Sequence, residues 1–341
     1  MAQPMYFLAI ETSCDETAAA VFTDEPRIIA HVVASQTPLH ERFRGVVPEV
    51  AARAHLRQLL PVIHETLTRA QMSLADIGAI AVVHTPGLAG ALLIGVSAAK
   101  MLAVVRRIPL IAVNHIEAHI YACQLVSTTP VFPCVGLVAS GGHTVLFECR
   151  DALHFRVLGA TLDDAAGEAF DKAAALLGLG FPGGPAIERL ARSGNPRAFA
   201  LPRAFLKDER LDFSFSGLKT ALLYTVRDLQ KLGRLDEVRR ADLAASFQAA
   251  IVDVLVAKCR QALERTGLRP LCVGGGVAAN TVLRRALAEM TGSLEVRLVV
   301  PPLEYCTDNA AMAAMAVETY RAGLYAPADL DAEPTYRPVG C

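Results

Sequence analysis

Short apolar runs separated by polar turns recur along the 341-residue chain. Residues 6–22, YFLAIETSCDETAAAVF, predict a strand, a polar turn and a second strand, which is the order of a β-hairpin. Residues 134–149, CVGLVASGGHTVLFEC, repeat that order. Because mixed strand and helix segments follow each hairpin, the pattern predicts an internal duplication, with two unrelated hairpins as the alternative.

The rest of the chain alternates between helical and strand-like patterns. A strand is predicted over residues 77–85, and helices are predicted over 49–70, 90–106, 163–178, 184–193, 216–232 and 241–266. Residues 269–287 predict a strand, a glycine turn and a helix, and residues 295–323 predict a strand, a loop and a closing helix. This alternation is typical of an α/β fold with helices layered on mixed sheets, in a chain long enough for two domains.

Composition and charge narrow the class of protein. With 53% hydrophobic and 20% charged residues, the chain has the composition of a folded globular protein. A net charge of −1 gives no general attraction to nucleic acid, so an RNA contact would need a local basic patch. The best candidate is residues 188–210, where six basic residues are interleaved with Phe199 and Phe205. An ordinary solvated surface is an equally good interpretation of this stretch.

Cysteine usage and apolar run length bear on location. The eight cysteines are scattered singly without a CxxC pair, which is typical of buried thiols in a reducing compartment. The first residues lack a basic segment, and Glu11 interrupts their apolar run. No uninterrupted apolar run reaches transmembrane length. We therefore expect a cytoplasmic protein with no membrane partner.

A pair of histidines in residues 113–120, VNHIEAHI, is the first candidate for chemistry. His115 and His119 lie one helical turn apart, so both imidazoles project from one side, as a metal site requires. The zinc-protease signature needs Glu directly after the first His, and Ile116 stands there, with Glu117 one place further on. On these residues alone, a metal site and a plain helix face are equally open.

A third metal ligand has a candidate in CTDNAAMAAMA, residues 306–316. Asp308 directly precedes a strongly apolar helix, so capping of that helix by Asp308 or Asn309 is the alternative role. Two imidazoles and a carboxylate with open positions suit Fe(II) or Zn(II). Asp308 is too far along the chain from His115 and His119 for the sequence alone to decide whether the three residues form one metal site.

Glycine turns stand at three strand or helix edges: residues 140–143, 183–184 and 274–276. Glycines let backbone N–H groups approach an anion closely, and Asn280 follows the third turn near a predicted helix start. One such cluster would be an ordinary turn, but three favour a nucleotide site. Asp171 lies on an acidic helix face and could accept hydrogen bonds from ligand hydroxyls, with a solvated face as the alternative.

Ten motifs in order across the chain carry a resemblance to a known family. They are IETSCDET, GVVPE, PGLAGALLIG, HIEAH, SGGHT, DDAAGEAFDK, FPGGP, LDFSFSGLKT, GGGVAAN and CTDNAAM. Together they resemble the universal tRNA threonylcarbamoyladenosine transferase family, called TsaD in bacteria. The resemblance implies an α/β, actin-like ATPase (ASKHA) fold of two duplicated lobes with a cleft between them. The lobes are expected at residues 1–112, completed by a C-terminal helix at about 308–325, and at residues 113–307.

The resemblance also implies a set of site residues. His115, His119 and Asp308 match the family's ligands for one divalent metal, for which we expect Fe(II) rather than Zn(II). Positions implied for the adenine nucleotide, either threonylcarbamoyl-adenylate or ATP, are Val138, Ala139, Ser140, Gly141, Gly142, Asp171, Gly184 and Asn280. Asp15 and Glu16, in the first hairpin turn, match acidic residues facing the same cleft, and either is a candidate general base.

The reaction that the resemblance implies is an acyl-type transfer. The threonylcarbamoyl group of threonylcarbamoyl-adenylate passes to the exocyclic amine of the adenosine beside the anticodon of ANN-decoding tRNAs, and AMP leaves. Implied partners are tRNA, the paralogous scaffold TsaB and the ATPase TsaE. Two departures from the family pattern are Thr85, where Gly is usual, and Ala139, where Val is common. The alternatives are a metallopeptidase and a non-catalytic nucleotide-binding scaffold of the same fold.

Overall fold

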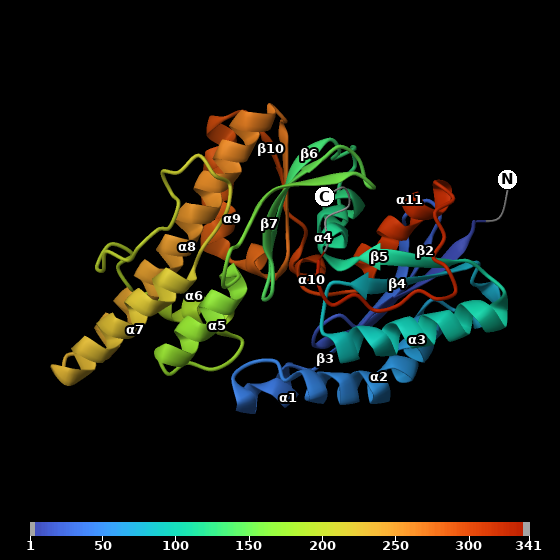
Figure 1. Ribbon diagram of the computed structural model, residues 1–341, viewed down its shortest axis with the longest axis horizontal. Coiled ribbons are helices and arrows are strands. Elements are labelled where there is room, and N and C mark those ends of the chain that lie inside the picture. The colour runs from blue at the N-terminus through green and yellow to red at the C-terminus, as the bar shows by residue number, and fades with distance from the viewer. Residues whose placement is uncertain (1–3, 337–341) are drawn as a thin grey trace. The chain divides into compact units, whose positions relative to one another are not determined.

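The computed structural model describes residues 4–336, which divide into two compact units (Figure 1). Unit 1 comprises the described residues up to Pro130, residues 151–155, and the described residues from Pro301 onward. Unit 2 comprises residues 131–150 and 156–300. The expected lobe boundary after residue 112 differs from this division, in which residues 113–130 belong to unit 1.

Unit 1 is built on a five-stranded sheet in the order β3-β2-β1-β4-β5. The strands are β1 (Tyr6–Glu11), β2 (Glu16–Thr23), β3 (Ile28–Ser35), β4 (Ala79–Thr85) and β5 (Leu110–Asn114). β1 and β2 form the predicted antiparallel hairpin, β3 continues it antiparallel, and β4 and β5 are parallel to β1. The helices are α1 (Thr37–His40), α2 (Pro48–Arg69), α3 (Ala89–Arg106), α4 (His115–Leu125), α10 (Leu303–Cys306) and α11 (Ala316–Arg321), with 3-10 turns η1 (Glu41–Phe43), η2 (Leu74–Asp76) and η4 (Ala311–Met315).

Helices cover both faces of this sheet because its central strands are apolar on both sides. Leu8 and Ile10 of β1 pack with buried side chains of α2 and α3 in one core cluster. Phe7, which points to the opposite face, meets Tyr320 of α11 edge-to-face with ring centroids 5.4 Å apart. Figure 1 shows α2 and α3 below this sheet, and α4 and α11 above it.

Unit 2 repeats the same strand order around a second hairpin. Its sheet runs β10-β9-β6-β7-β8, with β6 (Cys134–Ala139), β7 (Thr144–Cys149), β8 (Phe155–Ala160), β9 (Pro270–Gly274) and β10 (Arg297–Val299). β6 and β7 are antiparallel, whereas β9 and β10 are parallel to β6. The helices are α5 (Ala166–Leu176), α6 (Gly183–Ala191), α7 (Ser216–Lys231), α8 (Glu237–Thr266) and α9 (Thr281–Ser293), with a 3-10 turn η3 (Gly276–Ala279). In each unit a central hairpin carries a third strand on one side and two parallel strands on the other, as the predicted duplication requires.

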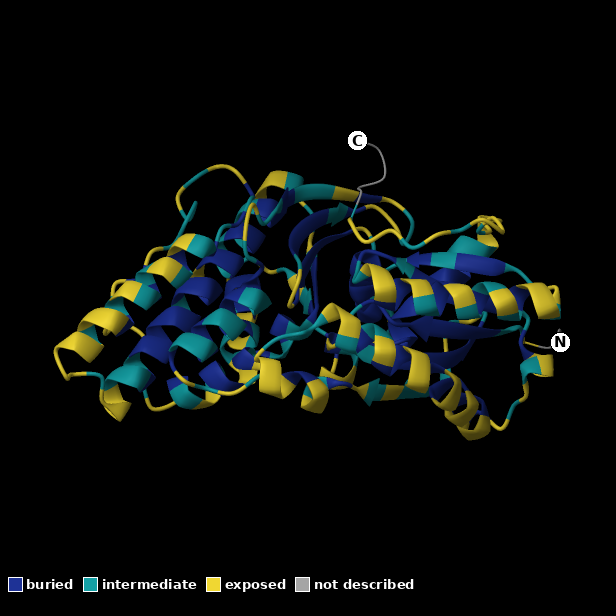
Figure 2. Cartoon of the chain, turned by 60° about the horizontal axis from the view of Figure 1, so that its bottom comes forward, coloured by how far each residue is buried: buried dark blue, intermediate teal, exposed yellow. Residues whose placement is uncertain are grey.

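Burial follows the predicted patterning, with buried strands inside and helices that alternate buried and exposed faces (Figure 2). All seven cysteines among the described residues are free thiols, and six of them are buried, as predicted. α3 is long and apolar enough to cross a membrane by length and composition alone. One face of α3 is packed into the core of unit 1 through Val96, Ala99 and Ala103. A core helix of a globular protein can have the same length and composition.

Candidate functional site

The two histidines owe their positions to the junction of β5 and α4. β5 ends at Asn114, whose Oδ1 accepts hydrogen bonds from the N–H groups of Ile116 (2.9 Å) and Glu117 (3.3 Å). This N-cap starts the helix at His115 and sets His119 one turn later, with ring centroids 4.7 Å apart. The predicted helical spacing is therefore confirmed.

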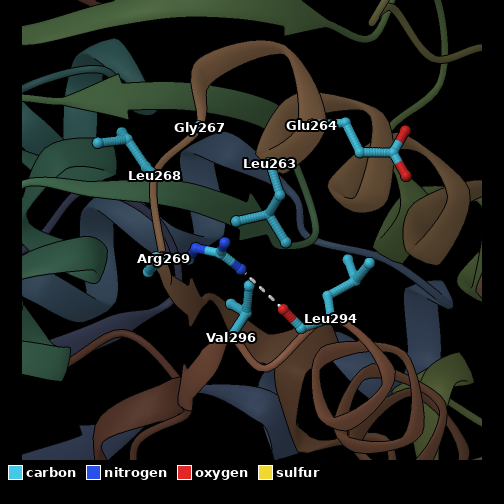
Figure 3. A pocket seen from close by; sticks show the side chains of 7 residues that line it. All are labelled: Leu263, Glu264, Gly267, Leu268, Arg269, Leu294 and Val296. Carbon is cyan, nitrogen blue, oxygen red and sulfur yellow. Dashed lines mark hydrogen bonds between the residues drawn. The ribbon is translucent and has the colours of Figure 1, made fainter.

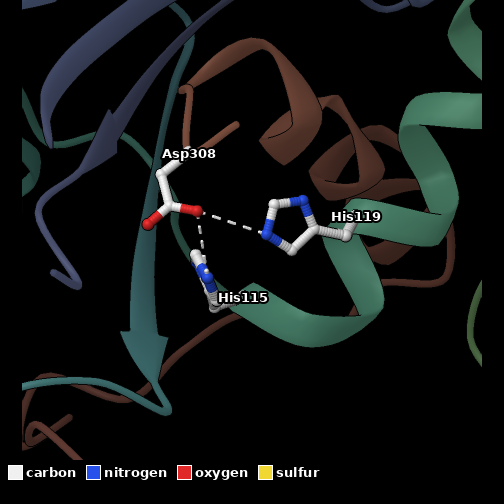
Figure 4. Close-up of side chains that lie close together, drawn as sticks. All are labelled: His115, His119 and Asp308. Atoms are coloured by element: carbon white, nitrogen blue, oxygen red, sulfur yellow. Dashed lines mark ion pairs between the residues drawn. The ribbon is translucent and has the colours of Figure 1, made fainter. Parts of the chain in front are cut away.

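Asp308 reaches the histidines from the loop between α10 and η4 (Figure 4). Its Oδ1 lies 3.5 Å from Nε2 of His115 and 3.3 Å from Nε2 of His119. The alternative capping role falls to Asn309, whose Oδ1 accepts the Met312 N–H at 3.1 Å. The fold thus brings all three predicted ligands together within unit 1.

The geometry of this trio fits a metal ion. Ligand atoms about 2.1 Å from a tetrahedral ion lie roughly 3.4 Å from one another, which matches the two distances from Asp308 to the histidines. His119 is fully buried, and neither of its ring nitrogens has a hydrogen-bond partner among the residues that the structure describes. An unsatisfied buried imidazole costs about 1–3 kcal/mol, and coordination of a cation would remove that cost. His115, His119 and Asp308 can therefore hold one divalent cation.

Buried polar groups of the first hairpin orient the imidazole ring of His115. Its Nδ1 lies 3.2 Å from Oε2 of Glu11 and 3.0 Å from Oγ of Ser13, and Glu11 is fully buried at the end of β1. A carboxylate on Nδ1 leaves Nε2 as the nitrogen that faces the cation site. Burial opposes protonation of His115, but Asp308 and Glu11 outweigh it and raise its pKa to about 9. Burial lowers the pKa of His119.

The role of Glu11 was not predicted, although the sequence held a signal for it. A carboxylate that interrupts an otherwise apolar strand needs a buried partner, and here the partner is His115. Glu117 behaves differently. Its side chain is buried and burial alone raises its pKa to about 7, which supports a structural role for this residue.

Asp15, one of the two candidate bases, lies beside the trio. Ligand atoms of Cys14, Asp15 and Asp308 are all within 4.8 Å of one another. Burial and the nearby Asp308 carboxylate raise the pKa of Asp15. Burial raises the pKa of Glu16 to about 7, although Oγ of Ser35 donates a hydrogen bond to its Oε1 at 2.8 Å. Carboxylates shifted in this direction suit proton acceptance near neutral pH.

The glycine turn at the end of β6 lies in unit 2. The Ser140 N–H donates to His143 O at 2.8 Å, which closes the turn after Val138 and Ala139. A side-chain carbon at Gly141 or Gly142 would meet nothing within 4 Å in the described part of the chain. These two glycines are thus in the open, where their backbone can face a ligand.

The third glycine turn, residues 274–276, contains a glycine that the fold itself requires, which the sequence did not predict. Gly275 has φ +88°, and a Cβ there would stand 2.4 Å from the carbonyl oxygen of Ala139. Its close backbone approach is therefore to the end of β6 rather than to an anion. Asn280 caps α9 by accepting the Leu283 N–H at 3.0 Å, and its Nδ2 donates to Gln248 at 2.8 Å. The amide of Asn280 thus holds the local structure together.

Asp171 and the second glycine turn are linked by one hydrogen bond. Oδ1 of Asp171 accepts the Gly183 N–H at 2.7 Å, which fixes the start of α6. A Cβ on Gly183 would stand 2.4 Å from the Asp171 Cα, whereas at Gly184 it would meet no described atom within 4 Å. The helix bearing Asp171 begins at Ala166 rather than at the predicted residue 163, because Thr161 forms a β-bridge with Phe213 and residues 162–164 form a bend.

A separate hollow in unit 2 contains none of these residues. It is lined by Leu263, Glu264, Gly267, Leu268, Arg269, Leu294 and Val296, and Nη1 of Arg269 donates to Leu294 O at 2.9 Å (Figure 3). The hollow lies where the chain enters β9, whereas the glycine turn follows the carboxyl end of that strand. Ligands of open α/β sheets bind at the carboxyl ends of strands, so this hollow is the less suitable nucleotide site.

The predicted basic stretch, residues 188–210, begins in the last turn of α6 and is irregular from there on. Nε of Arg203 lies 2.7 Å from Oδ2 of Asp253, and Nε of Arg210 lies 2.9 Å from Oδ2 of Asp208. The Arg210 guanidinium also stacks over the Phe205 ring, 4.6 Å from its centroid. At least two of its cations therefore have partners within the chain, and its contact with RNA stays a prediction.

The chain has an α/β fold with two five-stranded mixed sheets of the same strand order, each flanked by helices, and the histidine–carboxylate trio belongs to unit 1. This is the actin-like ATPase fold. Solved structures agree. Full-length HypF in its phosphate- and nucleotide-bound form is 14% identical with a TM-score of 0.64, covering 95% of this chain and 58% of HypF. Component A of the Acidaminococcus fermentans (R)-2-hydroxyglutaryl-CoA dehydratase is 16% identical with a TM-score of 0.54, covering 93% and 98%. At these identities the likeness concerns the fold.

Sequence relatives identify the family. The model of the TsaD family, tRNA N6-adenosine threonylcarbamoyltransferase, matches residues 27–315. Proteins of that name from Symbiobacterium thermophilum and Rhodopirellula baltica are 53% and 49% identical, covering 96% of this chain and 95% and 96% of their own lengths. The chain therefore belongs to the TsaD family, and it is a tRNA-modifying acyltransferase.

Proposed function

We propose that the chain transfers the threonylcarbamoyl group of threonylcarbamoyl-adenylate to the exocyclic amine of the adenosine beside the anticodon of ANN-decoding tRNAs. The observation that carries this proposal is the trio of His115, His119 and Asp308, assembled in a chain about half identical to the named transferases. In the reaction, the amine nitrogen bonds to the carbamoyl carbonyl carbon, the bond from that carbon to the phosphate oxygen breaks, and AMP leaves with the electron pair.

The trio would hold one divalent cation. Two histidines and one carboxylate with open positions suit Fe(II) or Zn(II), and we propose Fe(II) because the family resemblance implies it. When bound, the cation would supply positive charge next to the carbonyl or phosphate oxygens as negative charge develops there. Glu11 holds His115 in the orientation that this ligation needs.

The amine must lose a proton as its new bond forms, and Asp15 and Glu16 are the proposed acceptors. Asp15 is the better placed of the two relative to Asp308, because their oxygens lie within 4.8 Å of one another. Glu16 has the pKa suited to a base at neutral pH, about 7. Substitution of each in turn separates these assignments, since the true base should be the one whose loss lowers kcat most.

Nucleotide recognition is assigned to unit 2. The open glycines Gly141, Gly142 and Gly184 would present backbone N–H groups to the adenylate, together with Val138, Ala139 and Ser140 at the end of β6. Asp171 and Asn280 would act through the turns that they hold, because both are already bonded to backbone N–H groups.

We propose tRNA, the paralogous scaffold TsaB and the ATPase TsaE as partners in the cytoplasm. Exposed apolar side chains support a protein partner on unit 1. They lie on α2 and α3, which pack together: Leu56 (72% exposed), Leu60 (69%), Met101 (63%), Val104 (67%) and Val105 (70%). Exposed large apolar side chains gathered on two packed helices are typical of a protein–protein interface.

The proposal is tested by supplying purified chain with iron, tRNA and preformed threonylcarbamoyl-adenylate, with and without the partner proteins. Mass spectrometry of the digested nucleosides should show threonylcarbamoyladenosine with the native chain and its loss with His119→Ala. His154→Ala, which alters an exposed histidine paired with Asp151, is the matched control and should retain activity. Absence of modified adenosine with metal-replete native chain and both partners would refute the proposal.

A further inference from the structure

The first hairpin turn supplies a second group of possible metal ligands next to the trio. Cys14 and Asp15 lie in this turn, between β1 and β2. One ligand atom each from Cys14, Asp15 and Asp308 lie within 4.8 Å of one another, and all three residues belong to unit 1. Among the described residues, the possible metal ligands thus fall into two groups that share only Asp308.

Asp308 is placed to serve both groups. Its Oδ1 faces Nε2 of His115 at 3.5 Å and Nε2 of His119 at 3.3 Å, and Figure 4 shows the other carboxylate oxygen pointing away from the histidines. Although it is fully buried and this close to Asp308, His119 Nε2 makes no hydrogen bond to any described residue. A ring nitrogen in that state indicates a cation beside Asp308. A carboxylate can bridge two cations, which lie about 3.5–4 Å apart in two-metal sites.

The backbone of the turn is held in place from two directions. Nε2 of His55, on α2, donates a hydrogen bond to the Cys14 carbonyl oxygen at 2.9 Å. The Gln36 N–H, after the end of β3, donates to the Asp15 carbonyl oxygen at 3.0 Å. The side chains of Cys14, Asp15 and Asp308 are only partly buried, so an ion from solvent can reach them.

The chemistry of these three side chains selects the kind of ligand. A thiolate and two carboxylates repel one another when they are ionised, and a cation removes that repulsion whereas an anion adds to it. A sulfur 2.3 Å and an oxygen about 2.1 Å from one ion lie roughly 3.6 Å apart, so closing from within 4.8 Å needs a movement of about 1 Å. The thiolate favours an ion such as Zn²⁺ over Mg²⁺ or Ca²⁺, which take oxygen ligands.

We propose that Cys14, Asp15 and Asp308 form a second cation site for Zn²⁺ or a similar ion, joined to the first by the shared Asp308. This inference rests on the part of the proposed function that makes the trio a cation site. It also decides between the two proposed proton acceptors. Asp15 bound to a cation cannot take the proton of the amine, which leaves Glu16. Loss of Asp15 would then lower activity by releasing the ion rather than by removing a base.

The test uses Co²⁺ alone, added to metal-free chain, with equilibrium dialysis for the number of bound ions and absorption spectra for the thiolate-to-cobalt charge-transfer band. The native chain should bind two ions and show the band. Cys14→Ser should lose the band, and Asp15→Asn should bind one ion without it. His119→Ala should also bind one ion but keep the band. Asp308→Ala should lose both ions, because its carboxylate serves both sites.

Cys306→Ser is the matched control. Cys306 lies two residues from Asp308, but its thiol donates to the Pro301 carbonyl oxygen at 3.3 Å and belongs to neither group, so this variant should keep both ions and the band. Circular dichroism of each variant checks that it is folded.

Two results would overturn the inference. A native chain that binds one cobalt ion without the band would show that Cys14 merely keeps its proton beside Asp15. Retention of both ions in Asp308→Ala would exclude the shared carboxylate. Transfer to tRNA distinguishes these failures from failure of the proposed function: a chain with one ion that still modifies tRNA leaves the proposed function intact, whereas a chain with two ions and the band but no transfer supports the second site and refutes the proposed function.

Discussion

Glu117 provides a quantitative test of the environment beside the trio of His115, His119 and Asp308. Its carboxyl lies among buried residues of α4, and burial raises its pKa from 4.5 to about 7. The folded protein thus keeps this proton to a higher pH than the unfolded chain does. The stability that protonated Glu117 contributes is therefore lost as the pH rises from about 4.5 through about 7. A shift of this size corresponds to about 3 kcal/mol in full.

The change to make is Glu117→Gln, which keeps the shape and removes the titration. Between pH 5.5 and 8.5 the native chain should lose about 2 kcal/mol from this group, from the two pKa values. The variant should gain that amount relative to the native chain over the same interval. The assay is urea unfolding at both pH values with a chelator present, so that metal binding does not contribute.

The matched control is Glu65→Gln on α2, which alters a carboxylate that is 49% exposed and paired with Arg69. It should change stability by less than about 0.5 kcal/mol at either pH. If the difference between Glu117→Gln and the native chain is the same at pH 5.5 and 8.5, the carboxyl is not titrating in a buried environment. The reasoning about Glu117 would then be wrong.

Three further predictions concern ligands. Asp308→Ala should lose most of the bound metal by elemental analysis, whereas His154→Ala should keep it; full occupancy in Asp308→Ala would exclude the site as described. Gly142→Ala should weaken adenine-nucleotide binding measured by calorimetry. It should leave the melting temperature unchanged, because a Cβ there meets no described protein atom within 4 Å. The control Gly292→Ala, at an equally open position on α9, should change neither nucleotide binding nor the melting temperature. Arg197→Ala should lower the slope of tRNA affinity against salt by roughly one unit for each phosphate that the side chain neutralises, and an unchanged slope in chain and assembly would place the RNA path elsewhere.

Most of the fold could be predicted because its signals are local. The hairpins at residues 6–22 and 134–149 combine continuous apolar runs with polar turns, and both formed as expected. β3 and β8 were missed, since neither is joined to its hairpin by a strong turn signal. The start of α8 was predicted four residues late, because the capping of Asp236 on Arg239 N was not recognised.

Local patterns predicted the candidate site only where its parts are close in sequence, whereas the place of Asp308 beside the histidines came from the family resemblance. The spacing of His115 and His119 is a property of one helix, and the structure confirmed it. Whether Asp308 or Asn309 caps the following turn could be decided only by the tertiary structure. The lack of a hydrogen-bond partner for Nδ1 of His119 among the described residues has no sequence signature, because it depends on what surrounds the ring in space. Sequence can propose ligands, but which groups lack partners is a property of packing.

The position of Asp308 in the chain has a consequence for biosynthesis. The two histidines emerge from the ribosome early, but their carboxylate partner follows the whole of unit 2 and returns with the last segment of unit 1. A nascent chain stalled anywhere before Pro301 presents two imidazoles without the third ligand, and it also lacks η4, which packs against α4. If the trio holds a metal ion as proposed, tight capture would await synthesis through the last segment of unit 1, and truncated products would not withdraw metal from the cell.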